Sequence, residues 1–141
     1  MLRVTYSPDG DGTGELRAFV DAQGVAGSGA AYFDETSLAA FCERLGDYPL
    51  QPDDLPSLAG GYWDPTGERL EATHLSIAVF PHDGLGTLRL EATMADSASP
   101  HPLEAKTWFL VGYNQLSNFQ RQLRGLLAGA VAEAVLVPGP D

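Results

Sequence analysis

Two neighbouring stretches of the chain alternate between apolar and polar residues, and this alternation constrains the fold more than any other feature. A spacing of two puts successive side chains on opposite faces of a β-strand. The residues HDGLG at 82–86 link the stretches with the length and composition of a hairpin turn. The sequence therefore predicts an antiparallel hairpin with one buried face. That face is expected to carry Leu75, Ile77, Val79, Leu88, Leu90, Ala92 and Met94.

Two other segments have apolar residues at helical spacing. The first predicted helix, Asp34–Leu45, follows a capping residue (Asp34 or Thr36) and ends before Gly46, as helices commonly do. The second predicted helix is Asn114–Leu127. Their apolar stripes are expected to be buried. The stripes comprise Leu38, Phe41, Cys42 and Leu45 in the first helix, and Leu116, Phe119, Leu123, Leu126 and Leu127 in the second.

The order of elements predicts an α+β domain. Further strands are expected at 2–6, 15–22, 25–33 and 105–113, so strands, a helix, strands and a helix follow one another through short links. This order favours one antiparallel sheet of five to seven strands with the two main helices packed on it. Strand 105–113 is the most apolar, so we expect it to be central, with Trp108 and Leu110 in the core.

The remaining segments are expected to lie at the surface of a single domain over residues 1–141. Residues 47–61, DYPLQPDDLPSLAGG, have no hydrophobic period and predict a proline-rich connection. DSASPHPLE, at 96–104, predicts a loop. Residues 136–141 predict either a short edge segment or a loose tail.

The stretch GVAGSGAAYFDE, residues 24–35, is the closest approach to a phosphate-binding loop. Such a loop needs a helix directly after its glycines, so that backbone N–H groups converge on the anion. Here AAYF continues a strand pattern before the helix begins, and no Gly-Lys-Ser/Thr follows. The glycines are therefore interpreted as a bulge, or as a place where another segment packs close to the backbone.

No other motif predicts a catalytic or metal site. Asp9 and Asp11 match the first half of a calcium loop, but Val20 stands where the closing glutamate belongs, which favours a turn between strands. His74, His82 and His101 are scattered, and His82-Asp83 falls in a hairpin turn. No serine lies in a nucleophile elbow, Ser28 being the nearest candidate. Cys42 is expected to be a small buried side chain. We expect no catalytic residues, no metal and no cofactor.

Negative charge is concentrated in the first half of the chain. The net charge is −11, and residues 9–71 hold 13 acidic residues against Arg17, Arg44 and Arg69, a balance of −10. Such a field repels nucleic acid and anionic membrane and attracts a basic partner. The N-terminus turns polar within six residues, and no apolar run approaches the roughly 20 residues of a membrane span, so a cytoplasmic location is expected.

These charges, with two aromatic residues, form the predicted partner-binding site. Tyr62 and Trp63 precede a turn and are candidates for an exposed interface anchor. Acidic residues lie in the connection and turn on either side, where loops present side chains without disturbing a core. The predicted site comprises Asp47, Asp53, Asp54, Tyr62, Trp63, Asp64 and Glu68.

Two segments, YFDETSLAAFCERLGDYPL and YNQLSNFQRQLRGLL, share an L-x-x-F-x-x-x-L cadence. In these segments and in its order of elements, the chain resembles small acidic bacterial immunity proteins of polymorphic and contact-dependent toxin systems. The resemblance implies a non-enzymatic binder that blocks a basic toxin without a cofactor. A regulatory or structural adaptor and a small enzyme are the alternatives. A toxin gene immediately upstream would favour the immunity role over the adaptor.

Overall fold

The computed structural model describes residues 1–95 and 104–139, and within these ranges the chain forms eight strands and two helices. Their bounds are β1 Leu2–Pro8, β2 Thr13–Ala22, β3 Val25–Asp34, α1 Glu35–Arg44, β4 Ser57–Trp63, β5 Leu70–Pro81, β6 Thr87–Ala95, β7 Glu104–Gly112, α2 Tyr113–Leu127 and β8 Ala134–Leu136. The α+β class is confirmed, and both predicted helices agree to within one residue at each end. The predicted loop at 96–104 lies outside the described residues except for Glu104, which begins β7.

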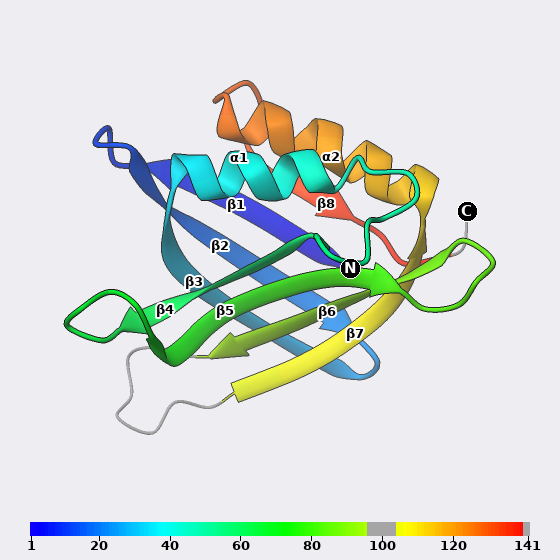
Figure 1. The fold of residues 1–141 in the computed structure, drawn as a ribbon, viewed down its shortest axis with the longest axis horizontal. Coiled ribbons are helices and arrows are strands. Elements are labelled where there is room, and N and C mark those ends of the chain that lie inside the picture. Colours follow the sequence, from blue (N-terminus) through cyan, green and yellow to red (C-terminus); the bar gives the residue numbers. More distant parts are fainter. Residues whose placement is uncertain (96–103, 140–141) are drawn as a thin grey trace.

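The strands form two antiparallel sheets of four, so the prediction of one sheet of five to seven strands is wrong. The first sheet has the order β3-β2-β1-β8 and the second has the order β4-β5-β6-β7. Strand β3 contacts β4, β5, β6 and β7, and β2 contacts β7, so the first sheet packs across the second (Figure 1). Helix α1 separates β3 from β4 in the chain, and β4 starts a new sheet instead of extending the first.

Glycines in β3 allow the two sheets to approach closely. A Cβ atom on Gly29 would collide with the backbone carbonyl of His74 on β5, and one on Gly27 would lie 3.2 Å from the Cβ of Ala105 on β7. Gly29 is needed because another strand crosses its backbone at contact distance, and Gly27 has only a tight space beside it. The stretch at 24–35 is thus confirmed as a strand with close backbone approach. This crossing also stacks the sheets in two layers.

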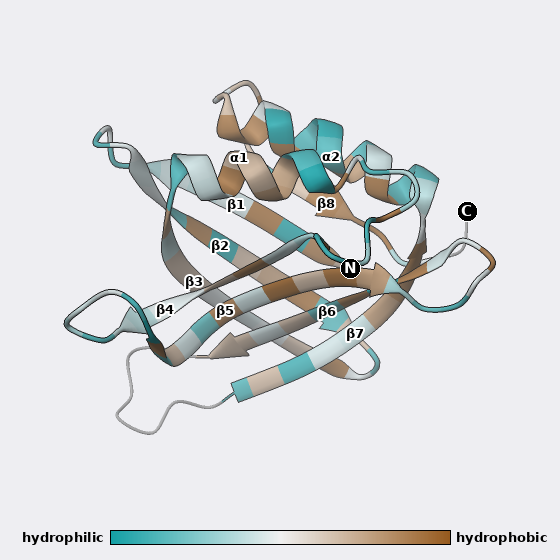
Figure 2. Cartoon of the chain, in the orientation of Figure 1, coloured by the Kyte–Doolittle hydropathy of each residue, from teal (hydrophilic) through white to brown (hydrophobic). Residues whose placement is uncertain are grey.

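Each helix bridges the two sheets. Helix α1 contacts β3 and β4, α2 contacts β1, β8 and β7, and the helices lie side by side over the same side of the molecule (Figure 1). Apolar and polar bands alternate along β2 and β5 (Figure 2), and the apolar residues face a single core shared by sheets and helices. Neither helix in the described part of the chain is long and apolar enough to cross a lipid bilayer.

The predicted core is confirmed except on β7. The inward residues of β5 and β6 and the stripes of both helices are buried as expected, apart from Leu127, which is partly buried. On β7, however, Phe109 and Val111 are buried, whereas Trp108 and Leu110 lie half-buried on the outer face. The strand is apolar on both faces, so its alternation does not identify the inner one. The Arg89 guanidinium covers the Trp108 ring at 4.1 Å and shields it from water.

Two peripheral segments also differ from expectation, and the C-terminal segment follows the alternative of a short edge segment. Strand β7 is at the edge of its sheet, not in the centre, because β6 is its only partner strand among the described residues. The connection predicted at 47–61 ends early, since β4 begins at Ser57 and its Leu58 is buried. At the other end of the chain, β8 pairs Leu136 with Leu2, and the N–H of Gly139 donates to the carbonyl of Leu110 at 2.8 Å. Residues 136–139 are therefore anchored, and residues 140–141 lie outside the described part.

Candidate functional site

A groove of about 980 Å³ lies where α1 bridges the edge strands β3 and β4. Residues from these three elements, from the start of β2 and from the turn after β4 line it, and Figure 1 shows where the elements lie. The lining residues are Thr13, Tyr32, Phe33, Asp34, Thr36, Ser37, Ala40, Arg44, Ser57, Leu58, Ala59, Trp63 and Gly67.

The groove has an apolar floor and two exposed aromatic side chains. Phe33 and Leu58 point into the core and are 8% and 6% exposed, so they form the floor. Tyr32 on β3 is 59% exposed and Trp63 on β4 is 43% exposed. Large aromatic side chains with this exposure beside an apolar floor are typical of surfaces that bind other proteins.

Helix α1 forms the upper wall and is fixed at its start by Asp34. The Asp34 carboxylate accepts the Ser37 N–H at 2.7 Å and the Ser37 hydroxyl at 2.9 Å, which caps the helix as the sequence predicts. These hydrogen bonds, the one from the N–H first, hold the pKa of Asp34 below its ordinary value. Asp34 is therefore a negative charge at the mouth of the groove near neutral pH.

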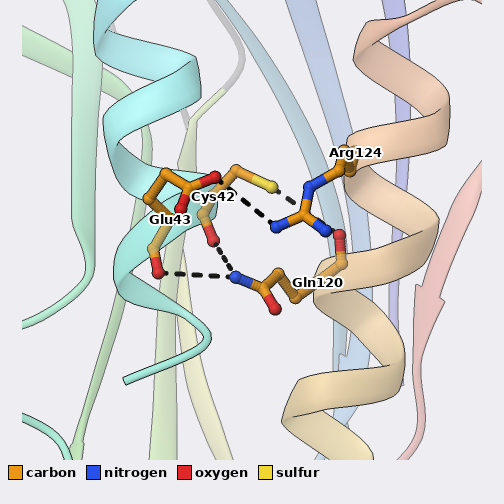
Figure 3. A network of polar contacts seen from close by, with 4 residues as sticks. All are labelled: Cys42, Glu43, Gln120 and Arg124. Carbon is orange, nitrogen blue, oxygen red and sulfur yellow. Dashed lines mark hydrogen bonds and ion pairs between the residues drawn. The ribbon is translucent and has the colours of Figure 1, made fainter.

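The far end of α1 is held by α2 through a polar network (Figure 3). The Gln120 side-chain amide donates to the carbonyl of Cys42 at 2.9 Å and to that of Glu43 at 3.4 Å. The Cys42 thiol donates to the Gln120 carbonyl at 3.6 Å, and Arg124 pairs with Glu43 at 3.4 Å. The network satisfies carbonyls at the C-terminal end of α1 that lack partners within the helix. It therefore holds the groove wall in place.

The predicted binding residues divide between the two ends of the groove. Tyr62, Trp63, Asp64 and Glu68 lie at the end of β4 and in the turn after it, whereas Asp53 and Asp54 lie in the loop before β4. Strand residues 57–61 separate the two groups by about 16 Å of extended chain. Arg44 on the groove wall pairs with Asp54, with 2.6 Å between Nε and Oδ1. Of the predicted residues, Trp63 lines the groove and Asp54 contacts its wall through Arg44, and the two groups do not form a continuous cluster.

Asp64 has a structural role in its turn. One oxygen, Oδ1, accepts the Thr66 hydroxyl at 2.8 Å and the Glu68 N–H at 3.1 Å. These bonds, the Thr66 hydroxyl first, lower the pKa of Asp64. Glu68 is exposed and has no such role, so it is the better candidate for contact with a partner.

Asp47 belongs to a different surface. It borders a hollow of about 480 Å³ with Tyr48, Leu85 and Tyr113, next to the ends of both helices. The Tyr48 and Tyr113 rings meet edge to face with 4.7 Å between centroids. The structure therefore does not bring Asp47 together with the other predicted residues.

Two groove residues, Tyr32 and Arg44, were not predicted as binding residues. In β3 the apolar Ala31 and Phe33 face inward, so the alternation alone places Tyr32 on the outer face. An aromatic residue at an outward position is a signal that sequence reasoning could have used. Arg44 had no comparable signal, because its pairing with Asp54 depends on the path of the loop.

The other polar motifs have local structural roles. Asp11 accepts the Thr13 N–H and hydroxyl in the β1–β2 turn, and Asp83 accepts the Leu85 N–H at 2.8 Å in the β5–β6 turn. Cys42 is buried as predicted, and burial raises the pKa of its thiol. Over residues 1–95 and 104–139, no three His, Cys, Asp or Glu side chains gather in a way that could hold a metal ion. His101 lies outside these residues.

The groove is therefore the strongest candidate site that the described residues offer. It combines exposed aromatic rings, an apolar floor and the acidic side chain of Asp34. The chain matches no protein-family model, no curated protein and no solved structure.

Proposed function

We propose that this protein is a non-enzymatic binding module that captures a basic protein through the groove between α1 and β4, and that it acts as an immunity-type inhibitor of a toxin. The observation that carries the proposal is the pair of exposed rings, Tyr32 and Trp63, that line the groove together with an apolar floor. Buried aromatic anchors contribute a large share of the binding energy in many protein interfaces.

The charge around the groove favours a basic partner. Asp34 lines the groove at the start of α1, and the exposed Glu68 directly follows Gly67, another lining residue. Arg44, the cation that lines the groove, is already paired with Asp54. The surrounding first half of the chain has a balance of −10. Such a field accelerates encounter with a cationic surface and disfavours nucleic acid.

The inhibitory role rests on the resemblance to immunity proteins and on this charge. A toxin that cleaves nucleic acid has a cationic surface, and an acidic binder covers such a surface without any cofactor. An adaptor would use the same groove but would leave the activity of its partner intact. The two roles therefore differ in a measurable consequence of binding.

Affinity capture from the organism of origin tests the proposal. The tagged protein is compared with Trp63→Ala and with Tyr48→Ala, which removes an aromatic side chain that is 81% exposed but lies outside the groove. We expect a basic protein to be captured in equal stoichiometry by the wild type and by Tyr48→Ala, and to be lost with Trp63→Ala. Capture that is indifferent to Trp63→Ala would contradict the groove as the site.

The captured partner then separates the two roles. Titrating the purified protein into an assay of the partner's activity should abolish that activity at one equivalent if the protein is an inhibitor. An unchanged activity in the saturated complex would identify an adaptor and reject the immunity role.

A further inference from the structure

The backbone of β4 presents unpaired hydrogen-bonding groups to the groove. The carbonyl of Pro56 accepts the Val79 N–H at 3.0 Å, so this pair is hydrogen-bonded across β4 and β5. In an antiparallel ladder the pairs alternate, so the N–H and C=O groups of Ser57 and Ala59 point away from β5. Both residues line the groove, and β5 is the one strand paired with β4. Within the described residues these groups are unpaired.

Strand β3 presents its backbone to the same groove. The Glu35 N–H donates to the carbonyl of Gly12 at 2.9 Å, just beyond the end of the β2–β3 ladder. The same alternation directs the backbone groups of Tyr32 and Asp34 away from β2. Both residues line the groove. Two sheet edges therefore face one groove, with α1 above them.

The β4 edge has little protection against an added strand. Natural edge strands are commonly protected by charged side chains or a proline within the strand, or by a bulge. Between Ser57 and Trp63 there is no charged side chain and no proline, and Ser57 and Ala59, whose backbone groups point to the groove, are small. A bulge between Gly60 and Gly61 interrupts the pairing only beyond Ala59. The segment 57–59 is thus open to backbone pairing.

We propose that an extended, lysine- or arginine-rich segment of the partner adds a strand to the β4 edge, in the groove between β4 and α1. The inference rests on the proposed function, since it takes the partner to be a basic protein. The segment hydrogen-bonds with Ser57 and Ala59, as in β-strand addition. Its alternate side chains reach the Trp63 ring and the carboxylates of Asp34 and Glu68.

Charge determines which kind of segment fits. Asp34 is held ionised by the Ser37 hydrogen bonds, and the Arg44 guanidinium is paired with Asp54 at 2.6 Å. Among the lining residues, Asp34 is thus the charge without an ion-pair partner. An acidic segment would meet Asp34 without a free cation in the lining, whereas a basic segment places its charge beside that carboxylate.

Synthetic peptides test strand addition directly. The probe is a capped nine-residue peptide of alternating lysine and threonine, compared with its glutamate–threonine counterpart and with a backbone N-methylated version. Ala59→Pro removes the outward N–H at an edge position where proline is tolerated. Ala59→Val keeps the N–H and is the matched control.

We expect the lysine peptide to bind the wild type and Ala59→Val alike, and the glutamate and N-methylated peptides not to bind. Ala59→Pro should weaken binding by about tenfold, as expected for a lost backbone hydrogen bond. In the wild type, the Ala59 amide should exchange its hydrogen about tenfold more slowly when the peptide is bound. Because hydrogen exchange is measured on the wild type, this second readout is usable even if Ala59→Pro fails to fold.

Two results would overturn strand addition. One is no binding of the lysine peptide up to about 1 mM, the weak limit of a specific contact. The other is binding that leaves the Ala59 amide unprotected. Both leave the proposed function standing if capture of the whole partner still depends on Trp63. Loss of that dependence would reject the groove itself, so the two failures are distinguishable.

Discussion

Arg44 on α1 and Asp54 in the loop before β4 form an ion pair with 2.6 Å between Nε and Oδ1. The pair lies at one end of the groove. It gives the adjacent acids Asp53 and Asp54 different electrostatic surroundings. Asp54 is neutralised by Arg44, whereas Asp53 is exposed and has no ion pair within the described part of the chain. Asp53 is therefore the member of this pair that is available to attract a partner.

Reversing the charge of Asp54 should lower the stability of the fold more than reversing the charge of Asp53. Asp54→Lys places a second cation beside Arg44, so we expect the free energy of unfolding to fall by about 1 kcal/mol, the upper range for a surface ion pair. Asp53→Lys should change it by less than about 0.5 kcal/mol. Urea unfolding of both variants measures the difference. Equal losses would show that the ion pair does not form in solution.

Gly29 should be intolerant of a side chain, although it lies in a stretch of small residues. A methyl group there would meet the His74 carbonyl, which belongs to the backbone of β5 and has little room to move. Gly29→Ala is expected to cost about 1–3 kcal/mol of stability through overpacking. Ser28→Ala, at the exposed neighbouring position, is the control and should be nearly neutral. Similar melting temperatures for both variants would refute the close crossing of the sheets.

Phe119 should contribute heavily to stability from the centre of the helix stripe. It is 1% exposed, so Phe119→Ala is expected to cost about 3–5 kcal/mol by leaving a cavity. Tyr32→Ala removes a ring that is 59% exposed and should cost far less. Calorimetric unfolding of the two variants provides the comparison. A small loss for Phe119→Ala would mean that the stripe is not packed as described.

Local sequence patterns were enough to predict the helices and most strands. They were not enough to predict how the strands divide into two sheets and how these sheets pack. The helices at Glu35–Arg44 and Tyr113–Leu127 follow from spacing and caps, which act within one or two turns. Whether β3 pairs with β4 or crosses it depends on contacts between residues far apart in the chain. The crossing at Gly29 and His74 is such a contact. A glycine-rich strand indicates that something lies close to it without saying which segment.

The same limit explains the error on β7 and why the groove could not be predicted. Trp108 and Phe109 are adjacent apolar residues, so the inner one is decided by register against β6, where Glu91 pairs with Trp108. Lys106, two residues before Trp108, marks the outer face and is the signal that was missed. The acidic and aromatic residues flanking β4 were predictable from composition and turns. The groove that lies between them was not, because it exists only where α1 bridges two sheets.

The Asp34 cap should make part of the stability depend on pH. Its pKa lies below the ordinary value of 3.8 because the Ser37 N–H and hydroxyl stabilise the carboxylate. A carboxyl group whose pKa is lower in the folded state than in the unfolded state stabilises the fold above about pH 4. This stabilisation is lost as the pH falls through the pKa of the folded state. Asp34→Asn keeps an acceptor for the cap but does not titrate.

We therefore expect the wild type to be more stable than Asp34→Asn at neutral pH. The difference in the free energy of unfolding between the two proteins should shrink steadily as the pH falls from about 5 to about 2. Urea midpoints measured across this range test the expectation. A difference in the free energy of unfolding that stays constant down to pH 2 would show that the carboxylate charge does not stabilise the helix.

The most direct test of binding through the acidic face is the association rate of the captured partner as a function of salt. Asp53→Lys/Glu68→Lys reverses two charges beside the groove, and Asp21→Lys/Glu104→Lys reverses two exposed charges elsewhere. For the wild type and the control pair, association should slow steeply with added salt while dissociation changes little. The groove pair should associate about tenfold more slowly at low salt, with a flatter salt dependence. Association rates that change neither with added salt nor with the charge reversals beside the groove would contradict capture through this acidic face.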